Sequence, residues 1–171
     1  MSPALQRPVV CILAVRPHGA TGFEVLLQRR TKTKDDTPYN GYLELPQGKV
    51  NRNESLMQAA HRELAEETGL TIRRFLVGGE QAFRSVAETS VMATSQPFVC
   101  VSDSVQNHIG LCVIVEVSGD LLVTKEASGH RWYSPGELET VIATNGLFPL
   151  NVPMVRRFLD TSPETEDAWL S

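Results

Sequence analysis

The chain has 171 residues, of which 42% are hydrophobic and 21% charged, and its formal net charge is −4. This length suits one domain that buries a core without disulfides or structural metal. The apolar runs are too short to span a membrane, and the absence of a long basic block argues against nucleic acid as a partner. We expect a single domain over residues 1–160 and a flexible acidic tail over residues 161–171.

The N-terminus lacks the charged segment, apolar run and small-residue cleavage site of a secretory signal, so we expect a cytoplasmic location. Three cysteines, Cys11, Cys100 and Cys112, lie in strand-like apolar runs without Cys-x-x-Cys spacing. We interpret all three as reduced core residues.

The N-terminal third is predicted to start with a β-hairpin. Pro8–Val15 is dense in branched apolar residues, and Phe23–Gln28 follows across a glycine-rich turn. A charged loop leads to a short strand, Tyr42–Leu45, which Pro46 and Gly48 end. The basic residues of that loop are expected to be solvated at the hairpin end, with phosphate steering as the alternative: Arg29, Arg30, Lys32 and Lys34.

A helix is predicted from Glu54 to Thr68. Leu56, Ala60 and Leu64 recur every four residues, which is typical of one apolar helix face. Asn51 or Asn53 is the expected N-terminal cap, with Glu54 completing a capping box after Asn51. Gly69 stands where a left-handed C-terminal cap belongs.

Strands and two helices are predicted for the remainder of the chain. The expected strands are Ile72–Ala82, Pro97–Val101 and His108–Val117. Ser134 followed by proline and glutamate predicts a helix that runs to about Ala143. A short terminal helix is expected over Val152–Leu159, after a sheet-rich middle of the chain.

Three glutamates on the first helix carry the chemistry. Glu63, Glu66 and Glu67 stand at i, i+3 and i+4, so a helix places them on one face, where like charges repel. Hard divalent cations such as Mg²⁺ and Mn²⁺ prefer carboxylate oxygens and would relieve that repulsion. Arg62 is positioned to hydrogen-bond a neighbouring carboxylate and hold its rotamer. A solvated acidic helix face is the alternative.

These glutamates belong to a longer pattern. Gly48, Glu54, the pair Arg62-Glu63, the pair Glu66-Glu67 and the pair Gly69-Leu70 keep fixed offsets. The pattern resembles the signature of the Nudix hydrolase family at every specified position. The resemblance implies an α/β/α sandwich with a mixed β-sheet and a catalytic loop-helix-loop motif. It also implies metal-dependent hydrolysis of a phosphoanhydride bond in a nucleoside di- or triphosphate-type substrate, with Mg²⁺ or Mn²⁺ as the cofactor.

The family pattern also implies roles for single residues. Glu66 and Glu67 bind metal, and Glu63 binds metal or acts as general base while Arg62 orients it. The Gly48 carbonyl would complete the metal shell, and Glu54 would support the Arg62 side.

Two features resemble the MutT-like branch of nucleoside triphosphate pyrophosphohydrolases. Lys49 follows the signature glycine, where a cation would stabilise the leaving phosphate; an ordinary exposed loop lysine is the alternative. Lys125-Glu126 followed by Trp132 repeats that branch's loop spacing, which makes Glu126 a candidate metal ligand or base. A solvated loop glutamate is the alternative there.

A third feature concerns the base of the substrate. Phe148-Pro149-Leu150-Asn151 resembles the segment whose asparagine reads a purine, although the spacing here is one residue shorter. Asn151 is therefore a candidate for substrate binding, while the cap of the terminal helix is the slightly favoured interpretation. Trp132 is a second candidate through stacking on the base, with core packing as its alternative.

The expected reaction is hydrolysis of a purine or oxidised purine nucleoside triphosphate to the monophosphate and pyrophosphate. Dinucleoside polyphosphate hydrolysis and RNA 5′-pyrophosphohydrolysis stay open, the latter because Leu45-Pro46-Gln47-Gly48 resembles the signature entry in such enzymes. A nucleotide-binding module without catalysis is also left open. The expected partner is a small nucleotide-type molecule, and a homodimer is left open.

Overall fold

The computed structural model describes residues 6–19, 22–31, 37–83, 92–104, 107–123 and 127–161. Its elements in chain order are β1 (Arg7–His18), β2 (Gly22–Arg29), η1 (Thr37–Tyr39), β3 (Leu43–Glu44), β4 (Gln47–Lys49), α1 (Leu56–Thr68), β5 (Thr71–Val77), β6 (Glu80–Phe83), β7 (Met92–Ser95), β8 (Val99–Asp103), β9 (His108–Ser118), β10 (Ser128–Tyr133), α2 (Pro135–Ala143), η2 (Pro149–Asn151) and α3 (Val152–Asp160).

Within the described residues, eight strands form one mixed sheet. Its main path runs β10-β2-β1-β9-β5, with β3 added to β2, β4 to β1 and β8 to β9. The central pair β1 and β9 is parallel, in a register that sets Cys11 beside Cys112. The predicted hairpin of β1 and β2 is present and antiparallel, and β6 pairs with β7 as a separate two-stranded sheet.

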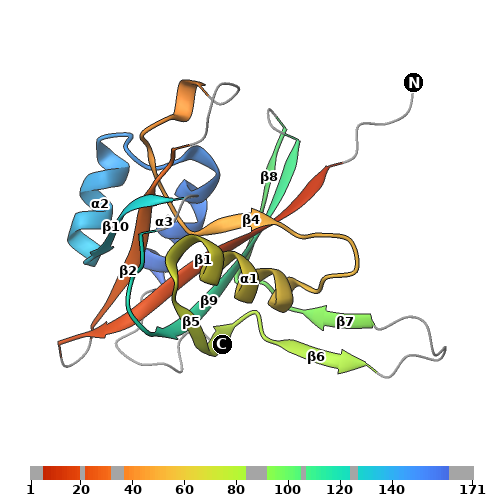
Figure 1. The fold of residues 1–171 in the computed structure, drawn as a ribbon. Coiled ribbons are helices and arrows are strands. Elements are labelled where there is room, and N and C mark those ends of the chain that lie inside the picture. Colours follow the sequence, from red (N-terminus) through yellow and green to blue (C-terminus); the bar gives the residue numbers. More distant parts are fainter. Residues whose placement is uncertain are drawn as a thin grey trace.

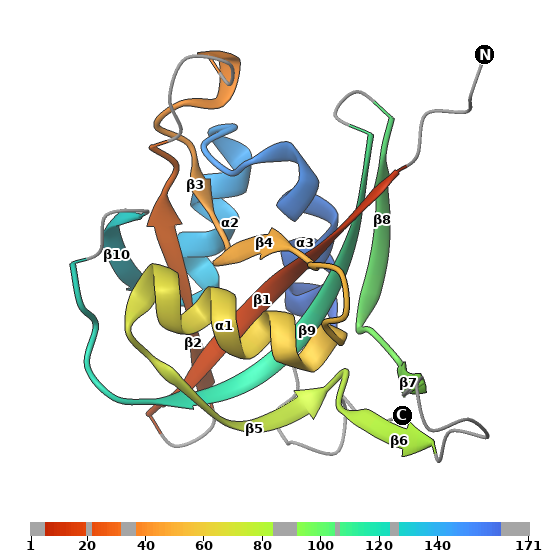
Figure 2. The same ribbon diagram turned by 45° about the vertical axis from the view of Figure 1, so that its right-hand side comes forward.

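Helices cover both faces of the sheet. Successive residues of β1 point to opposite faces, as a pleated strand requires, and both sets are buried. Cys11 and Leu13 pack in the cluster that contains residues of α2 and α3, whereas Val10 and Ile12 pack against α1. Figures 1 and 2 show α1 lying across one face, with α2 and α3 behind the sheet. The predicted α/β/α sandwich is therefore confirmed.

The first helix has a different N-terminal cap from the predicted one. Ser55, rather than Asn51 or Asn53, is the cap: its hydroxyl accepts from the Gln58 main-chain N–H, and the Gln58 side chain accepts from the Ser55 N–H. Glu54 does accept from the Asn51 N–H, but this contact shapes the loop that precedes the helix. The predicted C-terminal cap is confirmed, since Gly69 has a φ of 75°.

The predicted strand Ile72–Ala82 breaks in the middle. Gly78 has a φ of 92°, and a Cβ there would lie 2.6 Å from Val113 Cγ1. Because only glycine accepts this conformation and this close approach, β5 ends at Val77 and the chain leaves the main sheet as β6. The hairpin of β6 and β7 extends away from the body of the fold (Figures 1 and 2).

The cysteines are all free thiols, but they are not all in the core. Cys11 and Cys112 are buried, and burial raises the pKa of each thiol, whereas Cys100 on β8 is exposed. The core prediction is therefore wrong for Cys100. No helix among the described residues is long and apolar enough to cross a membrane. Of the predicted acidic tail, residues 161–171, only Thr161 belongs to the described part of the chain.

Candidate active site

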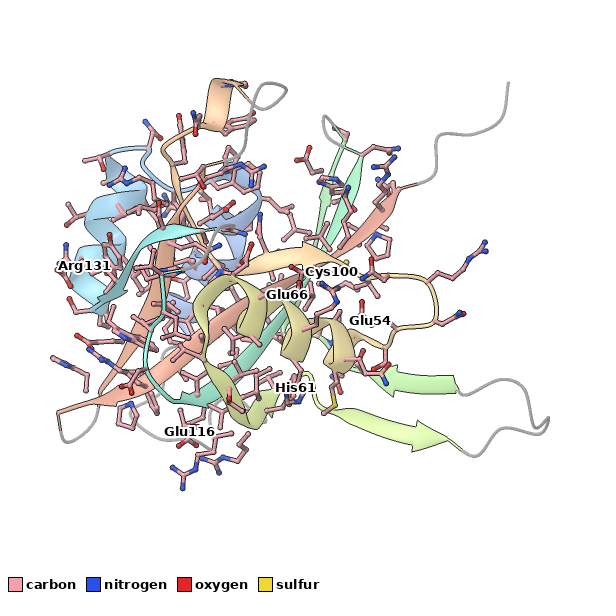
Figure 3. The ribbon with its side chains drawn as sticks, viewed as in Figure 1. Glu54, His61, Glu66, Cys100, Glu116 and Arg131 are labelled. Carbon is pink, nitrogen blue, oxygen red and sulfur yellow. The ribbon has the colours of Figure 1, made fainter. Side chains whose placement is uncertain are left out.

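The acidic residues of α1 continue its buried stripe. Leu56, Ala60 and Leu64 face the sheet as expected, and Glu63 and Glu67 occupy the next positions of the same stripe. Glu66 lies to one side, and its side chain is 49% exposed. Figure 3 shows Glu66 and His61 on different sides of the helix. Two of the three predicted carboxylates thus stand where the helical period calls for apolar side chains, and one faces solvent.

Glu63 lies directly against the backbone of β4. A Cβ on Gly48 would come within 1.9–2.1 Å of the carboxyl atoms of Glu63. No side chain fits between them, so glycine is required at position 48 for the helix to approach the strand this closely. This contact gives the signature glycine a steric reason.

Arg62 connects the loop before α1 with the carboxylates on it. Its guanidinium donates two hydrogen bonds to Glu54, from Nε to Oε1 at 2.7 Å and from Nη2 to Oε2 at 2.8 Å. Nη1 donates to Glu63 at 2.6 Å and to Glu66 at 3.2 Å, and Nη2 also donates to the Lys49 carbonyl at 2.9 Å. The hydrogen bond from Arg62 is the main cause of the lowered pKa of Glu54. The planar fork of arginine makes all these contacts at once, which lysine cannot do.

Glu67 is buried, with 4% of its surface exposed. Two donors converge on its Oε2: Gln28 Nε2 at 2.8 Å and the Gln47 main-chain N–H at 2.9 Å. Burial nevertheless raises the pKa of Glu67 to about 8, and repulsion from Glu44 and Glu63 adds to the rise. A buried carboxyl with this pKa carries a proton at neutral pH unless a cation takes the proton's place.

A layer of buried polar residues lies beneath these glutamates. Glu44 forms an ion pair with Arg30, whose guanidinium stacks 4.2 Å from the ring centroid of Phe148. Gln47 Nε2 donates to Glu44 at 3.3 Å. The expectation that Arg30 is solvated is therefore wrong, because β2 directs it into the interior, where Glu44 compensates its charge.

Asn151 belongs to this layer. Its Oδ1 accepts from the Leu45 N–H at 3.0 Å and its Nδ2 donates to Gln47 Oε1 at 2.8 Å. It occupies the N-cap position of α3, but among the described contacts its side chain makes no capping bond. The favoured cap role is therefore wrong, because the side-chain amide is hydrogen-bonded to Leu45 and Gln47 instead. The side chain is completely buried, so in this conformation it presents no surface to a base.

The other predicted site residues lie around this centre. Lys49 is exposed on β4. Trp132 packs partly buried on the α1 side of the sheet, and the guanidinium of Arg16 lies 4.5 Å from its ring centroid, so one ring face is already covered. Glu126 lies outside the described residues. The loop that leads to it is attached to α1, because the Leu122 N–H donates to the Thr68 carbonyl at 2.9 Å.

The donor set fits a hard divalent cation. Glu63, Glu66 and Glu67 supply only oxygen, and a cation next to Glu67 would favour the charged form that burial disfavours when it raises the pKa of this carboxyl. In the described part of the chain, however, no three histidine, cysteine or acidic side chains stand close enough to hold an ion. Arg62 draws Glu63 and Glu66 to itself while Glu67 turns toward β2 and β4. Binding would therefore require Glu63 or Glu66 to exchange its contact with Arg62 for the ion.

Comparison with known families agrees with this geometry. Residues 5–158 match the family model described as the NUDIX domain. The chain belongs to the Nudix hydrolase family. As a Nudix hydrolase it cleaves a pyrophosphate bond in a nucleoside diphosphate-linked substrate, and the family typically uses divalent metal ions. A comparison with curated protein sequences gave no significant match.

Solved structures share the Nudix fold at low identity. A NUDIX-family hydrolase from Clostridium perfringens is 16% identical, with a TM-score of 0.61 over 94% of this chain and 100% of that one. A MutT protein from Methanosarcina mazei is 22% identical, with a TM-score of 0.58 over 92% and 96% of the two chains. The NUDIX domain of Shewanella oneidensis NrtR, complexed with ADP ribose, is 16% identical, with a TM-score of 0.60 over 94% and 90%.

The sequence did not predict the buried polar residues around Glu67 on the sheet side. These are Gln28, which donates to Glu67, and the hydrogen-bonded pair Glu44 and Gln47. A weak signal for Gln28 was present, because it directly follows the apolar run Val25-Leu26-Leu27 in the same strand. No comparable signal marked Glu44, because a short strand next to a charged loop predicts an exposed acid.

Proposed function

We propose that this Nudix hydrolase uses Glu63, Glu66 and Glu67 to hold divalent cations, with Glu126 as a further ligand or base from the loop after β9. One observation carries the proposal. Glu63 and Glu67 are both buried on the core-facing stripe of α1, and a bound cation would relieve the repulsion that Glu63 exerts on the Glu67 carboxylate. A merely solvated acidic face would place these groups in water instead.

The residues around the glutamates suit phosphoryl chemistry. A bound cation would neutralise non-bridging phosphate oxygens and acidify the attacking water. Arg62 keeps the carboxylates ordered before the substrate arrives, and the Gly48 carbonyl is a further candidate oxygen ligand. Lys49 is exposed beside the site and is suited to stabilise the leaving phosphate.

For the substrate we propose a nucleoside triphosphate, cleaved to the monophosphate and pyrophosphate. The similarity to MutT-type structures supports this choice. Because Asn151 is buried, no described residue supports a purine in particular. A preference for a purine or an oxidised purine is therefore to be tested by assay of different nucleotides. Dinucleoside polyphosphates and RNA 5′ ends stay as alternatives within the same reaction.

A second candidate is a nucleotide-binding module without turnover. The Shewanella NUDIX domain complexed with ADP ribose motivates it, because that structure is similar to this chain. The presence of every signature carboxylate argues against this candidate, since binding alone does not require a metal-held water.

A panel assay tests these assignments. The full chain is incubated with Mg²⁺ or Mn²⁺ and nucleoside triphosphates, oxidised nucleotides, nucleotide sugars, ADP-ribose, dinucleoside polyphosphates or triphosphorylated RNA, and released phosphate and pyrophosphate are measured separately. We expect pyrophosphate from a nucleoside triphosphate, with turnover lost in EDTA. Binding of a nucleotide without turnover in either metal would favour the non-catalytic module.

A further inference from the structure

Gln28 stands at an unusual position in β2. Val25 and Leu27 pack in the cluster on the α2 and α3 side, whereas Leu26 packs in the cluster against α1. By the period of the strand, Gln28 shares the face of Leu26 and points toward α1. It is completely buried there, in an environment that apolar side chains usually occupy. Such a break in a local rule is typical of a functional position.

The amide of Gln28 is oriented by Glu67. Its Nε2 donates to Glu67 Oε2 at 2.8 Å, and the Gln47 N–H from β4 reaches the same oxygen. The Gln28 Oε1 is buried and has no hydrogen-bond partner among the described groups. Because an amide can rotate to satisfy either end, this orientation indicates that the contact with Glu67 decides how the side chain lies.

The fold holds this end of α1 in other ways. The ring of His130 on β10 hydrogen-bonds the main chain of Glu67, and the Leu122 N–H donates to the carbonyl of Thr68. Leu64 packs in the core beneath the helix. Gln28 is therefore not needed to dock the helix, and its specific contact is with the carboxylate itself.

We propose that Gln28 is a positioning residue that holds the Glu67 carboxylate in the orientation in which it ligates the divalent cation. The inference rests on the proposed function, because it takes Glu67 as a ligand. Two donors from different strands fix one carboxylate oxygen, and Gln28 supplies the donor that substitution can remove. Groups that orient a metal ligand change metal affinity without touching the metal.

The test measures Mn²⁺ binding to the full chain by titration calorimetry and by the spin resonance of free Mn²⁺. In Gln28→Met, which keeps the length and removes the donor, we expect the Kd for Mn²⁺ to rise about 10-fold. At saturating metal the KM for the nucleotide should stay near its original value. Leu26→Val is the matched control, since it changes a buried residue on the same face without a polar contact; it should lower the melting temperature and leave the Kd unchanged.

The double variant of Gln28→Met and Glu67→Gln tests the role of Gln28 separately from the proposed role of Glu67 as a metal ligand. If Glu67→Gln alone weakens Mn²⁺ binding and Gln28→Met then adds little, Gln28 acts through Glu67. An unchanged Kd in Gln28→Met, with a raised Kd in Glu67→Gln, overturns the inference and leaves the function standing. The inference is also overturned if Gln28→Met raises the Kd for Mn²⁺ by the same factor in the original protein and in Glu67→Gln. An unchanged Kd in Glu67→Gln instead removes Glu67 as a ligand, and with it the proposed function of that residue.

Discussion

Glu66 and Glu67 are adjacent in the chain, yet they meet different environments. Glu67 is buried under two donors, whereas Glu66 is half exposed and contacts Arg62. A helix turns by about 100° per residue, and Glu66 lies one step outside the buried stripe to which Glu63 and Glu67 belong. In the proposed metal site the two carboxylates would therefore act from different surroundings, and the effects of substituting each one should be separable.

Substitution of either carboxylate by an amide is predicted to remove most turnover. Glu66→Gln and Glu67→Gln should each lower kcat by roughly 10²-fold or more, because each loses a charged ligand at the centre that stabilises the transition state. Steady-state kinetics at saturating Mg²⁺, with circular dichroism to verify folding, provide the measurement. Near-normal rates in both variants would contradict the metal site.

The pKa of Glu67 predicts how stability depends on pH in the metal-free protein. Burial raises the folded-state pKa from 4.5 to about 8, so the folded form binds the proton more tightly than the unfolded form. The stability that this proton contributes is fully present below the pKa of Glu67 in the unfolded chain and is lost as the pH rises through its pKa in the folded protein. In EDTA, the melting temperature should therefore fall between about pH 5 and pH 8 by roughly 2–4 °C or more beyond the fall in Glu67→Gln. Parallel curves for the two proteins would show that Glu67 does not titrate in this range.

At the scale of elements, the close contact of α1 with β4 depends on Gly48. Gly48→Ala would place a Cβ about 2 Å from the Glu63 carboxyl group, so the helix or the strand must shift. We predict at least a roughly 10-fold loss in kcat, because small displacements of catalytic groups are costly. Gly136→Ala in α2 is the matched control, since a Cβ there meets nothing within 4 Å. Equal activity of both variants would mean that the Glu63 contact has no catalytic consequence.

Asn151 links the start of α3 to Gln47 on β4 and to Leu45, which lies between β3 and β4. Its replacement by alanine removes the hydrogen bond to Gln47 Oε1 and leaves the buried Leu45 N–H without its side-chain acceptor, at about 1–3 kcal/mol for an unpaired group. Asn151→Ala should therefore lower the melting temperature by roughly 2–4 °C or more and leave the ratio of kcat/KM for purine and pyrimidine nucleotides unchanged. A collapse of that ratio at constant stability would restore the base-reading role.

At the scale of the whole molecule, the proposed metal site on α1 would be formed only in the folded protein, because β2 and β4 supply the groups that hold Glu67. A cation held by the folded form alone stabilises it by about 2.7 kcal/mol at a concentration of 100 times Kd. For a domain of this size we predict a rise in melting temperature of roughly 5–10 °C with Mn²⁺. The double variant of Glu66 and Glu67 to glutamine should lose this rise. An equal shift in the double variant would place the stabilising ion elsewhere.

Much of this protein could be predicted from short stretches of sequence. The period of Leu56, Ala60 and Leu64 with Gly69 behind it predicts the helix, because helical contacts join residues three and four apart. The signature from Gly48 to Leu70 predicts the family and the acidic site because its residues lie close together in the chain at fixed offsets. The same spacing occurs twice before the helix, and Ser55 is the cap rather than Asn51, because Ser55 and Gln58 form both bonds of the capping box while Glu54 is bonded to Arg62.

Only the tertiary structure decided which residues hold the glutamates. Gln28 and Glu67 are 39 positions apart, and Asn151 and Gln47 are 104 apart. Their contacts depend on the order of the strands and on the faces that the strands present. The buried pairing of Arg30 with Glu44 depends on the same arrangement, because a charge enters the core only where the fold supplies its opposite. Local spacing therefore determined the chemistry of the site, and the pairing of distant strands determined the environment that tunes it.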